Sequence, residues 1–257
     1  MLAAGYATRL RPLTDDVAKP LLPLAGRPMV DYLYDKLAAV EDVDEVHVVT
    51  NSRFAADFRR WADREERSVP IVVHDDATTS NEDRLGAIGD IRFVLDEGGL
   101  RGDDLLVVAG DNLFDFDLRD FVTFWRAKGA SGSAMGVHDI GDPDMIRRYS
   151  MVEVDEDDRI TSLVEKPEEP TSTLAGIAVY LFRSDHVERV DEYLAEGNSP
   201  DQPGRFLVWL YPRVPVFGYR FAGDWLDIGD RQQLLDADNR MRERAGLPRR
   251  AEYSLEG

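Results

Sequence analysis

Two lysines that stand directly before proline are the first residues of this 257-residue chain whose type suggests chemistry. The chain holds 31 lysines and arginines, but only four of them are lysines, so arginine supplies most of the positive charge. A compact ammonium on a flexible stem serves a phosphate in ways that a planar guanidinium does not. Lysine is therefore expected to be required in Lys19-Pro20 and in Lys166-Pro167.

A loop of small residues near the N-terminus has the composition of a phosphate-binding turn. Small side chains after a strand let backbone N–H groups approach phosphate oxygens closely, and nearby cations add the charge that a departing pyrophosphate needs. Without those cations the same stretch would be an ordinary strand-to-helix turn. The candidate residues are Ala3, Ala4, Gly5 and Thr8, with Arg9 and Lys19 as the cations.

An aspartate at the end of an apolar run is the next candidate. Asp111 follows the run Leu105–Ala109 in the tripeptide Gly-Asp-Asn. The carboxyl end of a buried strand is where α/β sheets place ligand chemistry, although an Asp-Asn turn alone would also fit. The nearby Asp115-Phe116-Asp117 matches the D-x-D pattern of metal-dependent glycosyltransferases. Asp117 is also well placed to cap a helix, and this is the interpretation we favour.

Apolar runs alternate with amphipathic patterns along the chain, as in βαβ units, and predict an α/β fold. A stub of a first strand is expected at Met1–Leu2, a helix begins near Pro28, and Ser52 caps another helix. The other predicted strands are Glu45–Thr50, Val69–His74, Leu105–Ala109, Gly132–Val137, Met151–Asp155, Ile160–Val164, Ala175–Phe182 and Val216–Phe221. The other predicted helices are Asp117–Lys128, Ser184–Ala195, Phe206–Val214 and Gln232–Arg244, with loops at Asp75–Gly89 and Gly197–Gly204.

Composition narrows the class of protein. With 43% hydrophobic residues the chain can bury one core, so we expect a single domain over residues 1–244 and a loosely held C-terminal tail over residues 245–257. No run reaches the roughly 18–20 apolar residues of a membrane span and no leader is visible, so a cytoplasmic protein without membrane contact is expected. The lack of cysteine excludes thiolate chemistry, and the four histidines show no metal-ligand spacing.

Charge limits the partners. The formal net charge of −19 repels nucleic acid, which is therefore a poor partner. It also repels nucleotides and phosphorylated substrates. A phosphate site in this chain needs local cations or a metal ion to overcome the general field, and the loop with Arg9 and Lys19 offers such cations.

The complete loop resembles the signature of the sugar-nucleotide nucleotidylyltransferases, G-G/A-x-G/A-T-R-L-x-P-x-T followed by K-P/Q-L-x-P. Here it reads Ala-Ala-Gly5-Tyr-Ala-Thr8-Arg9-Leu-Arg-Pro-Leu-Thr14 and then Lys19-Pro-Leu-Leu-Pro. The resemblance covers nearly the whole chain. Within the family, the sequence resembles the glucose-1-phosphate thymidylyltransferases. It implies a Rossmann-like, doubly wound α/β fold with a mixed, mainly parallel sheet and helices on both faces, of the nucleotide-diphospho-sugar transferase type.

The resemblance also implies roles for single residues. The implied catalytic residues are Arg9 and Lys19, and the implied ligands of a catalytic magnesium ion are Asp111 and Asp227, the latter in Trp-Leu-Asp-Ile-Gly. The implied nucleotide-binding residues are Ala3, Ala4, Gly5 and Thr8 for the phosphates and Arg84, Leu85 and Gly86 beside the base. The implied sugar-phosphate-binding residues are Glu165, Lys166, Gly176 and Trp225.

Three positions depart from the family pattern. Ala4 and Ala7 replace two loop glycines of the thymidylyltransferases. Ser150 stands where many relatives have a glycine beside the sugar. These departures bear on the choice of sugar and nucleotide more than on the class of reaction.

The expected reaction joins a nucleoside triphosphate to a sugar 1-phosphate and releases pyrophosphate, with dTTP or UTP and a hexose 1-phosphate as the expected substrates. The sequence leaves open other bases, a non-sugar acceptor such as phosphocholine, and a homo-oligomeric state. Two alternatives remain. A metal-dependent glycosyltransferase would consume nucleotide sugar. A non-catalytic regulatory protein of the same fold would lack Arg9, Lys19, Asp111 or Asp227, all of which are present.

Overall fold

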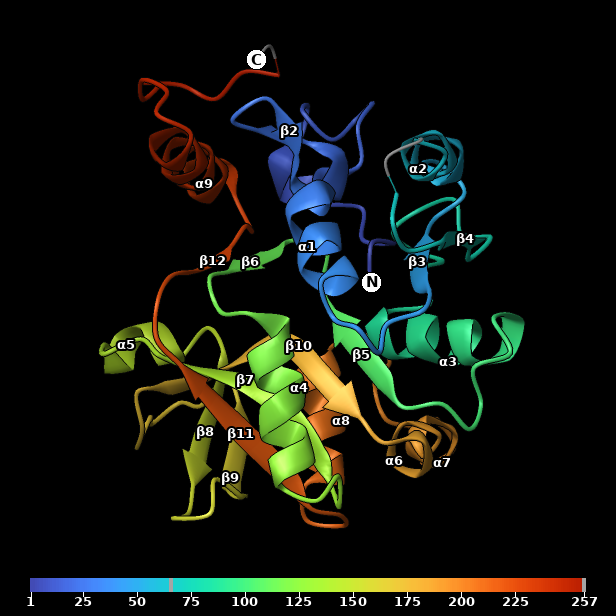
Figure 1. Ribbon diagram of the computed structural model, residues 1–257, viewed down its shortest axis with the longest axis vertical. Coiled ribbons are helices and arrows are strands. Elements are labelled where there is room, and N and C mark those ends of the chain that lie inside the picture. The colour runs from blue at the N-terminus through green and yellow to red at the C-terminus, as the bar shows by residue number, and fades with distance from the viewer. Residues whose placement is uncertain (65–66, 256–257) are drawn as a thin grey trace. The chain divides into compact units, whose positions relative to one another are not determined.

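The computed structural model describes residues 1–64 and 67–255, and the chain divides into two compact units (Figure 1). The first unit combines Met1–Arg84, Ala109–Phe114 and Asp224–Gly257, and the second combines Leu85–Val108 with Asp115–Gly223. Both units contain helices and strands, which confirms the predicted α/β class. One domain over residues 1–244 stays a prediction.

Parallel strand pairing organises the first unit. Strands β3 (Val46–Thr50) and β4 (Ile71–Asp75) pair in parallel, and Leu2 forms parallel bridges to Val49 and to Ala109. The predicted strand at Met1–Leu2 is thus reduced to two bridges. The other elements of this unit are β1 (Pro23–Leu24), β2 (Arg27–Pro28), β6 (Asn112–Phe114), β12 (Trp225–Asp227), α1 (Met29–Ala38), α2 (Ala55–Ala62) and α9 (Arg231–Arg244).

A six-stranded sheet forms the centre of the second unit. Its order is β11-β7-β10-β8-β9, with β5 also beside β10. The β11–β7 pair is parallel and the other pairs of this sheet are antiparallel, which refines the predicted mixed sheet. The strands are β5 (Leu105–Val108), β7 (Ser133–Asp139), β8 (Ser150–Val154), β9 (Ile160–Glu165), β10 (Leu174–Phe182) and β11 (Val216–Phe221).

Helices cover both faces of this sheet. Figure 1 shows α4 in front of the sheet, where it contacts β7 and β11, and α8 behind it, where it contacts β9 and β10. The Asp117 side chain accepts a hydrogen bond from Arg119 N at the start of α4, which confirms the predicted helix cap. The helices are α3 (Ala87–Glu97), α4 (Leu118–Ala127), α5 (Pro143–Ile146), α6 (Ser184–Val187), α7 (Val190–Ala195) and α8 (Pro203–Leu210).

Several predicted boundaries were wrong. The sequence pattern does not predict helix α3, which begins inside the predicted loop Asp75–Gly89. The predicted helix Ser184–Ala195 is divided into α6 and α7. Helix α8 starts earlier than predicted, because Pro203 fits the first turn, where no N–H is needed. Ser52 does not cap α2, because its hydroxyl donates to Asp75 at 2.6 Å.

The C-terminal tail is not loosely held, contrary to the prediction, in its described part up to residue 255. Asn239 of α9 both donates to the Arg250 carbonyl and accepts from the Arg250 N–H, at 2.9 and 2.7 Å. The Tyr253 hydroxyl donates to the Pro23 carbonyl at 2.8 Å. These hydrogen bonds replace the hydrophobic anchor that the polar tail sequence lacks. The last two residues of the predicted tail, 256 and 257, lie outside the described residues.

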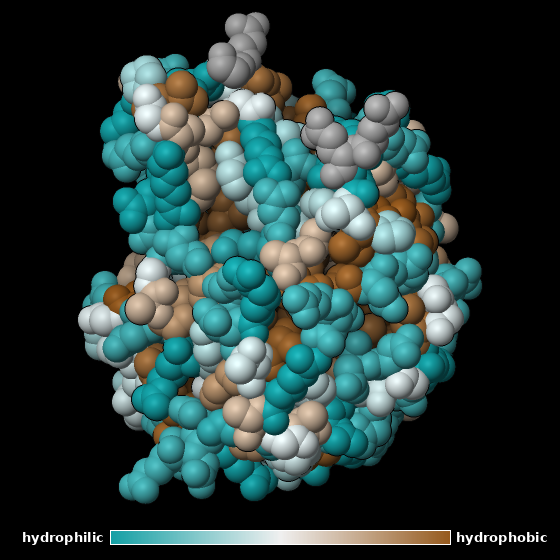
Figure 2. All heavy atoms as spheres, in the orientation of Figure 1, coloured by the Kyte–Doolittle hydropathy of each residue, from teal (hydrophilic) through white to brown (hydrophobic). Residues whose placement is uncertain are grey.

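The described surface is largely polar. Hydrophilic side chains spread over the face drawn in Figure 2. Among the described residues, the large hydrophobic side chains that are exposed are Val164, Leu247 and Leu255. No helix of residues 1–64 and 67–255 has the length and apolar character that crossing a membrane demands.

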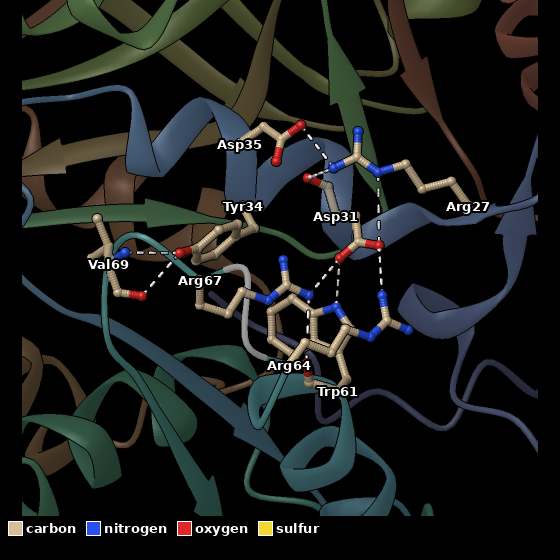
Figure 3. A network of polar contacts seen from close by, with 8 residues as sticks. All are labelled: Arg27, Asp31, Tyr34, Asp35, Trp61, Arg64, Arg67 and Val69. Carbon is tan, nitrogen blue, oxygen red and sulfur yellow. Dashed lines mark hydrogen bonds and ion pairs between the residues drawn. The ribbon is translucent and has the colours of Figure 1, made fainter.

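A buried aspartate on α1 connects this helix to α2 and to the segment that follows α2 (Figure 3). Asp31 accepts hydrogen bonds from Trp61 Nε1 and Arg67 at 2.7 Å each, and from Arg64 at 3.1 Å. The Arg67 guanidinium also lies over the Tyr34 and Trp61 rings, at 4.5 Å from each centroid. Burial alone would raise the pKa of Asp31, but the hydrogen bonds and charges of these partners hold it below its ordinary value.

We predict that Asp31→Ala lowers the free energy of unfolding by about 3 kcal/mol at neutral pH, because it leaves a buried guanidinium and indole without their acceptor. Asp35→Ala is the control, since its side chain is 55% exposed and should cost less than about 1 kcal/mol. A lowered pKa in the folded state contributes stability above the ordinary aspartate pKa and loses it as pH falls through the lowered value. Urea unfolding of both variants should therefore show a difference in the free energy of unfolding between Asp31→Ala and Asp35→Ala that becomes smaller below about pH 4. Equal costs for the two variants would contradict this account.

Candidate functional site

Hydrogen bonds from buried residues fix the start of the N-terminal loop, while other residues of the loop are exposed to solvent. Ala3 N donates to the Val49 carbonyl at 2.9 Å, and the buried Asn51 donates its Nδ2 to the Ala4 carbonyl at 2.9 Å. Gly5, Thr8 and Arg9 are exposed, and nothing lies within 4 Å of a Cβ built on Gly5. The loop therefore leaves open space beside its backbone, as contact with a ligand requires.

Ala7 adopts the backbone conformation of a glycine. Its φ of 44° and ψ of 44° are left-handed, a region that costs an L-residue about 1 kcal/mol or more. The Thr14 hydroxyl donates to the Ala7 carbonyl at 3.0 Å and holds this turn. The departure from glycine at this position thus leaves the backbone in the conformation that glycine would favour.

Lys19 is buried and pairs with Asp111. It begins a 3₁₀ turn, Lys19–Leu21, and its Nζ lies 2.6 Å from Asp111 Oδ2. The turn packs closely on the residue before the aspartate, because a Cβ added to Gly110 would lie 3.0 Å from both the Leu2 carbonyl oxygen and Pro20 Cγ. The small residue and the proline therefore bring the ammonium and the carboxylate together.

Asn112 joins the two predicted metal ligands. Strands β6 and β12 pair antiparallel with Asn112 opposite Asp227. Asn112 Nδ2 donates to Asp111 Oδ1 at 3.0 Å and to Asp227 Oδ1 at 3.2 Å, and its Oδ1 accepts from Trp225 Nε1 at 2.9 Å. Sequence reasoning missed this role of Asn112, although the Gly-Asp-Asn tripeptide was its signal, and it did not anticipate that the Trp225 indole contacts Asn112.

The two carboxylates differ in pKa. Burial raises the pKa of Asp227 above its ordinary value, and the neighbouring Asp111 charge raises it further. Burial would also raise the pKa of Asp111, but the Lys19 charge and hydrogen bonds from Lys19 and Asn112 hold it below its ordinary value. The Lys19 ammonium pairs with Asp111, and the charges of Lys19 and Arg9 both act to lower the pKa of Asp227.

The donor set fits a hard divalent cation. Carboxylate oxygens are the ligands that magnesium prefers, and magnesium usually takes one or two of them together with water and phosphate oxygens. Within the described residues no group of three or more histidine, aspartate or glutamate side chains could hold a metal. Two carboxylates, Asp111 and Asp227, are fewer than such a group, and their role as magnesium ligands stays a prediction.

Arg9 places a guanidinium beside this cluster. A Cβ added to Gly229 would lie 3.2 Å from Arg9 Nη2, so the arginine lies over the chain two residues after Asp227. Its charge acts to lower the pKa of Asp227. Its side chain forms no hydrogen bond or ion pair with the rest of the described chain, and its charge is available to an anion.

The predicted sugar-phosphate residues of the second unit lie on adjacent strands. Ser150 of β8 is opposite Gly176 of β10 on one side and opposite Glu165 of β9 on the other. A Cβ on Gly176 would lie 2.3 Å from Met135 Cε, so this glycine makes room for a methionine. Lys166 follows at the strand end with a left-handed φ of 49° and an exposed side chain.

The predicted base-reading residues are divided between the units. Arg84 belongs to the first unit, where it donates to the Asn81 carbonyl at 2.5 Å. Leu85 and Gly86 open the second unit, just before α3. Gly86 has a φ of 78°, and a Cβ there would lie 2.7 Å from the Pro200 carbonyl oxygen, so glycine is required.

We predict that Asn112→Asp is destabilised by about 2–4 kcal/mol in buffer with a chelator, because it adds a third carboxylate and removes two donated hydrogen bonds. Magnesium should then raise the melting temperature of this variant more than that of the parent. Sodium chloride at matched ionic strength is the control for general screening of the acidic surface. A magnesium shift in the variant that is no larger than the shift in the parent would contradict this prediction.

Comparisons with known proteins identify the family of this chain. The family model described as nucleotidyl transferase matches residues 1–244. The chain is 31% identical over 229 residues to mannose-1-phosphate guanylyltransferase of Mycobacterium tuberculosis, covering 89% of this chain and 60% of that protein. It is 27% identical over 241 residues to UTP–glucose-1-phosphate uridylyltransferase of Synechocystis, covering 89% and 59%.

Solved structures show the same fold. UDP-glucose pyrophosphorylase from Acinetobacter baumanii superposes with a TM-score of 0.78 at 18% identity, covering 96% of this chain and 94% of that one. The chain spans between 52% and 60% of the length of the first curated relatives that it matches.

Proposed function

The chain belongs to the nucleotidyl transferase family, and we propose that it transfers a nucleoside monophosphate group from a nucleoside triphosphate to a sugar 1-phosphate, with release of pyrophosphate. One observation carries the proposal. The two cations Arg9 and Lys19 and the two carboxylates Asp111 and Asp227 gather in one unit, at a loop with exposed backbone.

The triphosphate would bind along the N-terminal loop. The exposed backbone at Gly5 and Thr8 can approach phosphate oxygens closely, and Arg9 has no other partner among the described residues. In a chain of net charge −19 such a local cation is what makes an anion site possible. Arg9 would hold the β- and γ-phosphates, whose charge increases as pyrophosphate leaves.

Magnesium would be held by Asp111 and Asp227. When bound, it would neutralise charge on the reacting phosphates. Lys19 already neutralises part of the Asp111 charge, and its buried ammonium is fixed at 2.6 Å from Oδ2. A fixed charge of this kind stabilises a phosphate transition state without having to reorganise.

The acceptor would be held by the second unit. Glu165 would accept hydrogen bonds from the sugar, and the exposed Lys166 would hold its phosphate. The attacking oxygen belongs to a phosphate that is already anionic, so positioning and charge neutralisation suffice and no general base is needed.

Two observations weigh against the alternatives. In the D-x-D sequence, Asp117 caps α4, which accounts for it without a glycosyltransferase metal site. A non-catalytic protein would have no need of a buried lysine paired with one of two adjacent carboxylates. For the substrates, we retain dTTP or UTP with a hexose 1-phosphate. The uridylyl relative fits this choice, and the guanylyl relative makes GTP the first alternative to test.

The proposal is tested by pyrophosphate release over a matrix of nucleoside triphosphates and sugar 1-phosphates. Magnesium is present in one half of the matrix and replaced by a chelator in the other. We expect release with at least one pair and only with magnesium. Release with no pair, or consumption of nucleotide sugar instead, would refute the proposed function.

The two lysines that precede proline should differ in their kinetic roles. Lys19→Ala should lower kcat by about 10²–10³-fold, because its charge acts on the transition state. Lys19→Arg should restore little activity, since a planar fork cannot take the place of a buried ammonium.

Lys166→Ala should instead raise KM for the sugar phosphate and leave KM for the triphosphate nearly unchanged. Steady-state kinetics with each substrate varied in turn measure both effects. A fully active Lys19→Arg, or a Lys166→Ala that changes only the triphosphate KM, would contradict these assignments.

A further inference from the structure

A buried serine beside Glu165 has no role in the function proposed above. Ser150 is 7% exposed, on the strand next to the glutamate and directly opposite it. Residues opposite each other on antiparallel strands project from the same face of a sheet. The two side chains therefore meet, and the Ser150 hydroxyl donates a hydrogen bond to Glu165 Oε2.

Gly204 of α8 packs closely against the same carboxylate oxygen and against the Ser150 hydroxyl. A Cβ added to Gly204 would lie 2.6 Å from Glu165 Oε2 and 2.6 Å from Ser150 Oγ. No larger residue fits there without moving the pair. Because Gly204 lies in the first turn of α8, the positive end of the helix dipole lies near this carboxylate oxygen.

The other carboxylate oxygen is left for a ligand. Glu165 is half-buried, and no hydrogen bond reaches its Oε1 from any part of the chain that the structure describes. Burial and the nearby Glu165 both raise the pKa of Tyr180. An ionised oxygen accepts hydrogen bonds and donates none.

We propose that Ser150 is a positioning residue for Glu165: it occupies Oε2, so that the carboxylate presents Oε1 alone to one hydroxyl of the acceptor sugar. The inference rests on the proposed function. It gives the acceptor class as the 1-phosphate of an uncharged sugar that carries a hydroxyl at the position read by Oε1. A sugar with a carboxylate at that position would be repelled.

A fixed single acceptor makes two predictions about sugar recognition. One sugar hydroxyl donates a hydrogen bond to Oε1. Removing that hydroxyl should lower kcat/KM by about 10–100-fold, because a charged group then loses its hydrogen bond. Removing any other ring hydroxyl should cost less. A freely rotating carboxylate would instead spread the penalty over adjacent positions.

The experiment uses the sugar 1-phosphate that the parent uses best, together with its monodeoxy analogues. We compare the parent, Ser150→Ala, Glu165→Ala and the double variant, with Ser162→Ala as the control. Ser162 lies three residues before Glu165 on β9, and no hydrogen bond joins it to Ser150 or to Glu165.

We expect the parent to show one strongly penalised deoxy position. Ser150→Ala should raise KM for the sugar phosphate, leave KM for the triphosphate unchanged, and reduce the penalty at that position to less than about tenfold. In the Glu165→Ala background, Ser150→Ala should have no further effect, because it acts through the carboxylate. Ser162→Ala should behave like the parent.

The outcomes separate this inference from the function beneath it. If the parent uses a sugar phosphate but the two substitutions are additive, or if the deoxy penalties are unchanged in Ser150→Ala, the positioning role is refuted and the proposed function stands. If the parent uses no sugar phosphate with any triphosphate, the proposed function fails and this inference fails with it.

Discussion

Two carboxylates forced close together in a chain of net charge −19 are the constraint on which the candidate site depends. Asp111 and Asp227 are neighbours because β6 and β12 pair with Asn112 opposite Asp227, and Asn112 donates a hydrogen bond to each carboxylate. Lys19 supplies the one ammonium at hydrogen-bonding distance. Pro20 packs closely on Gly110 and so fixes the distance between the Lys19 ammonium and the Asp111 carboxylate. The Lys-Pro and Gly-Asp-Asn motifs therefore both serve to place one cation beside this pair of carboxylates.

The chain uses arginine for most of its positive charge and has four lysines. Arginine neutralises carboxylates throughout the described surface and in the buried Asp31 cluster, where its planar group can also lie over aromatic rings. Lys19 is instead buried, with its compact ammonium 2.6 Å from one carboxylate oxygen of Asp111. The second unit shows a different solution, in which a neutral serine and a glycine control the orientation of the Glu165 carboxylate.

Sequence alone predicted what local composition controls. The α/β class, most strand positions and the Asp117 cap followed from apolar periodicity and capping chemistry. The ion pair of Lys19 with Asp111 was not predicted. Contacts between distant segments could not be predicted in this way. The roles of Asn112 and Ser150 depend on strand register. The C-terminal tail is fixed by single side-chain hydrogen bonds such as those of Asn239 on α9, and such bonds produce no periodic pattern in the sequence.

The central claim is that this cluster directs cleavage between the α- and β-phosphates of a nucleoside triphosphate. Phosphorus NMR of a reaction mixture with magnesium and a sugar 1-phosphate identifies the bond that breaks. The account predicts equal amounts of inorganic pyrophosphate and a new pyrophosphate diester in the parent, and neither product in Asp227→Asn, with the fold of that variant unchanged. Formation of orthophosphate and nucleoside diphosphate, or identical products from Asp227→Asn, would contradict it.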